Sequence, residues 1–61
     1  MLDAVKVSEY AHALYRAHGD KAEAEAAQRA RRHAEMGESD QADTWRRIRS
    51  ALHQMRGPRQ T

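Results

Sequence analysis

Apolar residues recur every three or four positions along this chain, which is the period of an amphipathic helix. In the first third, Val7 and Leu14 share one helical face with Ala11 between them. The clearest stripe lies near the other end and consists of Trp45, Ile48, Leu52 and Met55. We therefore predict a core built from Val7, Leu14, Trp45, Ile48, Leu52 and Met55.

Glycines separate these stretches, at positions 19, 37 and 57. Glycine commonly follows the last turn of a helix because it adopts a left-handed conformation without a Cβ clash. The sequence thus predicts helices over residues 4–18, 20–36 and 39–56. Asp3, Asp20 and either Ser39 or Asp40 are the expected N-caps, since their side chains can accept from free N–H groups of a first turn.

The glycines also mark an internal repeat with an offset of 18 residues. His18-Gly19-Asp20 aligns with Met36-Gly37-Glu38, and Ala27 aligns with Trp45. Two equivalent short turns make sequential helices antiparallel neighbours. We therefore expect an all-α, three-helix, up-down-up antiparallel array. It would form one domain over residues 1–57, with a frayed tail at 58–61.

The turn regions are similar to those of tetratricopeptide helical hairpins. The residues that carry this resemblance are Leu14, Tyr15, Gly19, Asp20, Ala24 and Ala27. The repeat of that family is about 34 residues long, so this chain would hold about one and a half units. The rest of the family's signature, including the proline after its second helix, is missing. The resemblance implies a peptide- or protein-binding role.

Charge is distributed unevenly along the chain. Residues 1–28 hold three basic and five acidic residues, for a net −2, whereas residues 29–61 hold eight arginines and four acidic residues, for a net +4. Asp43–Arg47 and Glu25–Arg29 have the spacing and order of helix ion pairs. The abundant Arg also fits a compositional bias, and together with the short, Ala-rich chain it is typical of a bacterial protein.

The composition argues against catalysis and metal binding. There is no cysteine, and no two of the four histidines have the spacing that puts both rings on one helical face. The serines lie outside any nucleophile motif. We expect no enzyme activity, no cofactor and no small-molecule substrate. The lack of cysteine, of an N-terminal apolar run and of a bilayer-length apolar stretch leads us to expect a cytoplasmic protein without a membrane partner.

A domain of this size has little apolar surface to bury. The leading hypothesis is therefore a helical protein–protein interaction module, which self-associates or serves as an accessory subunit of a larger complex. The candidate partner-binding residues are Tyr10, Tyr15, Arg29, Arg32, Arg46, Arg47 and Arg49. The alternative is nucleic-acid binding, in which the arginines of the second and third helices would merge into one phosphate-binding patch.

Overall fold

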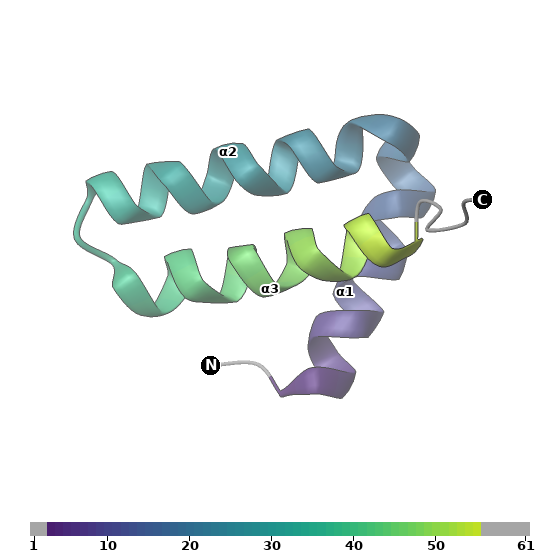
Figure 1. The fold of residues 1–61 in the computed structure, drawn as a ribbon, viewed down its shortest axis with the longest axis horizontal. Coiled ribbons are helices and arrows are strands. Elements are labelled where there is room, and N and C mark those ends of the chain that lie inside the picture. The colour runs from purple at the N-terminus through teal and green to yellow at the C-terminus, as the bar shows by residue number, and fades with distance from the viewer. Residues whose placement is uncertain (1–2, 56–61) are drawn as a thin grey trace.

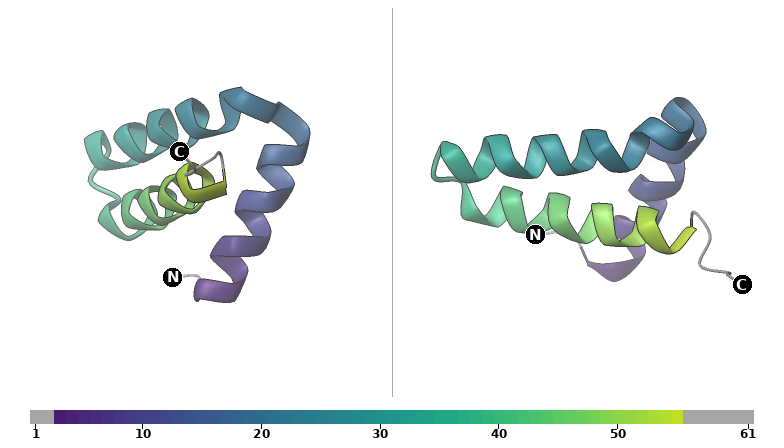
Figure 2. Two further views of the ribbon diagram at one scale, coloured as in Figure 1. Left: turned by 45° about the vertical axis from the view of Figure 1, so that its right-hand side comes forward. Right: turned by 45° about the horizontal axis from the view of Figure 1, so that its top comes forward.

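The computed structural model describes residues 3–55, and all regular structure within them is helical. The elements are α1 (Ala4–His18), a short 3-10 turn η1 (Gly19–Lys21), α2 (Ala22–Glu35) and α3 (Ser39–Met55). The all-helical prediction is confirmed. The expected tail at 58–61 lies outside the described residues. Helices α2 and α3 form an antiparallel hairpin, and α1 lies crosswise at the end where α2 begins and α3 ends (Figures 1 and 2).

The up-down-up arrangement is wrong at the first connection, because no loop separates α1 from α2. Gly19 takes φ 60° and ψ −132°, yet its N–H still donates to Tyr15 O as in a continuing helix. The 3-10 turn then carries the chain directly into α2, with the N–H of Ala22 donating to Gly19 O. The first two expected helices are thus one helix with a bend. Lys21 occupies the N-cap position of α2 with no side-chain bond, so the predicted Asp20 cap is also wrong.

The second turn reverses the chain as expected, and it differs in geometry from the first. Gly37 has φ +78°, and its N–H donates to Ala34 O at 3.1 Å. The N–H of Glu38 donates to His33 O at 2.9 Å, which completes a Schellman motif. The two halves of the sequence repeat therefore adopt different turns.

The N-cap residue of α1 is the one that the sequence predicts, whereas the N-cap residue of α3 is a different one. Asp3 caps α1 by accepting from the N–H of Lys6 at 2.9 Å. Ser39 is already the first residue of α3, which leaves the cap position to Glu38 instead of Ser39 or Asp40. Glu38 O accepts from the N–H of Ala42, the first bond of the helical ladder.

Alanines form the face of α2 that meets the core. Ala22, Ala26 and Ala30 are buried and recur every four residues, so they line one side of the helix. Small side chains allow the backbone of α3 to approach closely. Large side chains come from the other helices, and Ile48 and Leu52 of α3 are almost completely buried.

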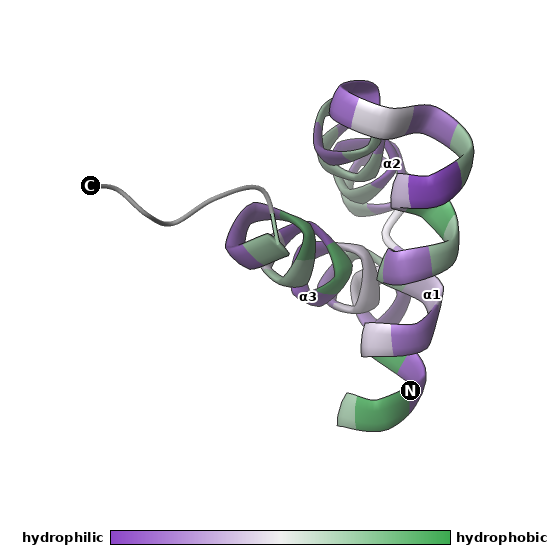
Figure 3. Cartoon of the chain, turned by 90° about the vertical axis from the view of Figure 1, so that its right-hand side faces the viewer, coloured by the Kyte–Doolittle hydropathy of each residue, from purple (hydrophilic) through white to green (hydrophobic). Residues whose placement is uncertain are grey.

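The predicted core residues divide into two groups. Val7, Ile48 and Leu52 are buried, and Ala11, Ala22 and Ala26 complete their cluster. Leu14, Trp45 and Met55 are only partly buried and pack against its edge, together with Tyr15 and Ala51. Hydrophilic and apolar segments alternate along each helix (Figure 3), as expected for helices with one covered and one exposed face. Within residues 3–55, none of the helices is both long and apolar enough to cross a membrane.

The close approach of α2 and α3 can be tested by enlarging one alanine. Ala26 is fully buried, so Ala26→Leu forces a larger side chain into a filled interface. We expect the free energy of unfolding to fall by about 1–3 kcal/mol. The matched control is Ala34→Leu, an exposed position on the same helix, which should change it by less than about 0.5 kcal/mol. Urea unfolding followed by circular dichroism measures the free energy of unfolding of both variants. Equal changes in the two variants would show that the interface between α2 and α3 accommodates a larger side chain at Ala26.

Candidate interaction surface

Three side chains, one from each helix, meet beside the core. Tyr10 of α1 and Trp45 of α3 form an edge-to-face pair with ring centroids 5.5 Å apart and planes at 83°. The Arg29 guanidinium of α2 lies over the Trp45 ring, 5.2 Å from its centroid. We call Tyr10, Arg29 and Trp45 the aromatic cluster. Aromatic pairs prefer this geometry because the positive edge of one ring faces the negative face of the other.

The aromatic cluster belongs to a longer chain of contacts that begins and ends on α1. His18 Nδ1 lies 3.3 Å from Glu25 Oε1, and Glu25 Oε2 lies 3.9 Å from Arg29 Nη2. Arg29 in turn contacts Trp45, and Trp45 contacts Tyr10. The guanidinium is thus held between a carboxylate and an indole face. Glu25 Oε1 is itself buried and accepts no hydrogen bond, although His18 Nδ1 lies near it.

Exposure distinguishes the two tyrosines that the sequence analysis selected. Tyr10 keeps 46% of its surface exposed despite its contact with Trp45. Tyr15 is half-buried and packs against the core. Of the two tyrosines, Tyr10 is therefore the one that presents a large aromatic surface to solvent. The other large apolar residues that are exposed within the described part of the chain are Val5 and Met36.

The arginines do not gather into a single uniform patch. Arg29 and Arg47 form the i, i+4 pairs expected from the sequence, and Arg47 Nε lies 3.1 Å from Asp43 Oδ2. Arg32 is exposed. Arg46 and Arg49 have no carboxylate within ion-pair distance among residues 3–55, and they line a shared open hollow between α2 and α3.

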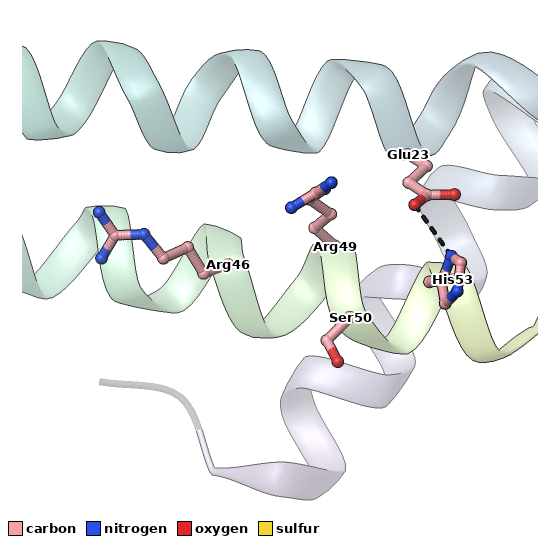
Figure 4. Close-up of a pocket in the computed structure, with 5 residues that line it drawn as sticks. All are labelled: Glu23, Arg46, Arg49, Ser50 and His53. Atoms are coloured by element: carbon pink, nitrogen blue, oxygen red, sulfur yellow. Dashed lines mark hydrogen bonds and ion pairs between the residues drawn. The ribbon is translucent and has the colours of Figure 1, made fainter.

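The hollow has a volume of about 280 Å³, and its remaining lining residues are Glu23, Ser50 and His53. Figure 4 shows that Arg49 reaches from α3 toward α2, whereas Arg46 extends along α3 in the direction of the turn. At the opposite end, His53 Nδ1 lies 3.2 Å from Glu23 Oε2. The hollow is therefore basic at one end and holds a His–Glu contact at the other.

Sequence reasoning missed this hollow because its residues come from two helices. The signal was nevertheless present, since helices that pair about a turn bring together residues at similar distances from it. Glu23 and His53 stand at nearly equal separations from Gly37, and Arg29 and Trp45 stand at equal separations. Both contacts follow from the antiparallel hairpin about Gly37 that the sequence predicts.

Histidines make three contacts with glutamates, in pairs that the sequence analysis did not foresee. They are His18 with Glu25, His33 with Glu38 at 2.6 Å, and His53 with Glu23. In the described part of the chain, His, Asp and Glu side chains do not gather in a group of three or more that could hold a metal ion.

Comparison with known proteins finds no relative of this chain. No protein-family model matches it, and neither a curated protein sequence nor a solved structure is significantly similar. The resemblance to tetratricopeptide hairpins stays a prediction.

The aromatic cluster generates a test of coupling between helices. Tyr10→Ala removes one ring of the pair, and Trp45→Leu removes the other while it keeps an apolar side chain against the core. In a double-mutant cycle, we expect the two losses of unfolding free energy to be non-additive by about 0.5–1.5 kcal/mol. Thermal or urea unfolding of the four proteins gives this coupling. Strict additivity would mean that the edge-to-face contact contributes nothing to stability.

Proposed function

We propose that this protein is a helical protein–protein interaction module that binds a second copy of itself or a larger partner, and that it has no catalytic role. The observation that carries the proposal is the aromatic cluster. Tyr10 is 46% exposed and packs edge-to-face against Trp45, and the Arg29 guanidinium lies over the Trp45 ring. Tyr, Trp and Arg are the residue types that dominate binding energy in protein interfaces.

The contacts within the cluster support its use as an anchor. An interface side chain that is ordered before binding loses less conformational entropy when the partner arrives. Tyr10 is held against the Trp45 ring, and Arg29 is held by both Glu25 and Trp45. A partner would therefore meet a preformed surface to which all three helices contribute.

The small core supports the same proposal. Among large side chains, only Ile48 and Leu52 are less than 2% exposed in the described part of the chain, and much of the remaining core is alanine. Burying Tyr10 against a partner would add apolar contact area where the chain itself provides little. Binding of this kind stabilises the folded state by mass action.

Nucleic-acid binding is the second candidate, and Arg46 and Arg49 are the residues in its favour. Both are exposed and lack a carboxylate partner among the described residues. Arg29 and Arg47 weaken this candidate because each has a carboxylate nearby. Arginines contribute most to phosphate binding when no neighbouring carboxylate already neutralises their charge.

Self-association is the first property to measure. Light scattering across a range of protein concentrations, at low and high salt, should show a dimer or larger species that persists at high salt. Tyr10→Ser should weaken that association about tenfold or more, because truncating a hot-spot aromatic residue costs about 2 kcal/mol or more of binding energy.

The matched control for Tyr10→Ser is His12→Ser, an exposed residue on the same helix. It should leave the association unchanged, and both variants should keep their helical circular dichroism. If the native protein is monomeric at every protein and salt concentration, the effect of Tyr10→Ser is measured on binding to a different protein. Association that Tyr10→Ser leaves intact would remove the aromatic cluster from the interface.

A further inference from the structure

The open face of the α2–α3 hairpin forms a second surface, separate from the aromatic cluster. Two adjacent hollows lie on it and share the residues Glu23 and Arg49. Ala24 and Ala27 of α2 line the second hollow, which has a volume of about 270 Å³. We infer that this face docks an acidic segment of a protein partner, with two of its carboxylates paired to Arg46 and Arg49. The inference rests on the proposed function and names the chemistry of the partner.

Charge complementarity is the basis of the inference. Arg46 and Arg49 are one helical turn apart on α3, and no carboxylate of the described chain neutralises them. Like charges at this spacing repel one another and weaken the helix slightly. Their neighbour Arg47 is paired with Asp43. Of the three arginines at positions 46, 47 and 49 of α3, the two that line the hollow are thus the ones without a carboxylate partner in the described chain.

The directions of the two side chains favour two separate carboxylates over a single phosphate group. In Figure 4 the Arg46 guanidinium points along α3 and the Arg49 guanidinium points toward α2, so they do not converge on one position. A phosphate group is best held by donors aimed at a common centre. Carboxylates spaced along a peptide segment match divergent arginines better.

The other lining residues determine how such a segment would lie. Ala24 and Ala27 are small, so a partner backbone can approach α2 closely between the two helices. Asp20 lies at the end of the face nearest the bend and would repel further carboxylates. The acidic residues of the segment therefore belong at the end of the face nearest the α2–α3 turn, with neutral residues toward the bend.

A synthetic peptide tests this inference directly. The probe is a fluorescein-labelled helical peptide of about 15 residues, with glutamates in its first half and alanine and glutamine in its second half. Its comparison peptide replaces every glutamate with glutamine. Fluorescence anisotropy with the full chain at low salt should give a Kd of about 0.1–1 mM for the acidic peptide and at least tenfold weaker binding for the glutamine peptide.

The variant Arg46→Gln with Arg49→Gln should weaken binding of the acidic peptide about fivefold or more. The matched control is Arg31→Gln with Arg47→Gln, which removes the same charge from exposed positions outside the hollows and should change the Kd less than about twofold. Both arginines of each pair are exposed, so we expect all variants to fold, as circular dichroism will show.

Four results would overturn the inference. The first three are no binding of the acidic peptide, equal losses in the two double variants, and loss of peptide binding in the control alone, which would place the site elsewhere. The fourth is tighter and Arg46/Arg49-dependent binding of a single-stranded oligonucleotide of equal charge, which would assign the face to nucleic acid. Since association through Tyr10 is measured separately, failure of this inference leaves the interaction-module proposal intact.

Discussion

The structure depends on the alanine face of α2. Ala22, Ala26 and Ala30 recur every four residues, and each is buried against the rest of the molecule. Because these side chains are short, α3 can lie close to α2 along its length, and the hairpin needs no bulky residue from α2. The consequence is a core whose large members come from α1 and α3. Such a core buries little apolar area, and the residues at its edge, such as Trp45, stay only partly buried.

Polar contacts accompany each place where the chain changes direction. His18 contacts Glu25 across the bend, His33 contacts Glu38 across the second turn, and His53 joins the end of α3 to Glu23 near the start of α2. Exposed pairs of this kind stabilise a fold only slightly because water and salt screen them. They matter here through their positions, since the first and the third link two helices and the second ties the end of α2 to the residue that precedes α3.

The sequence predicted the elements better than their arrangement. Helical periodicity located all three helical stretches, and Gly37 ended α2 with the expected left-handed conformation. The error lay at Gly19, where the identical local signal produced a bend. A glycine can leave the helical conformation for a single residue, and whether the next residues resume the helix is decided by tertiary packing. Here α1 packs mainly against α3, and the crosswise position requires the helix to resume at once.

The sequence does not show how the helices pack against one another, and this also limited what could be predicted of the candidate surfaces. Tyr10, Arg29 and the arginines of α3 were selected by residue type, yet nothing local indicated that Tyr10 would remain exposed while Tyr15 packed against the core. That difference follows from the bend, because the bend decides which side of α1 faces α3. The same bend places α1 at one end of the hairpin (Figure 2). None of the described residues that line the hollow of Arg46 and Arg49 comes from α1. One glycine conformation thus accounts for both surfaces: it brings Tyr10 to Trp45, and it leaves the other face of the hairpin uncovered.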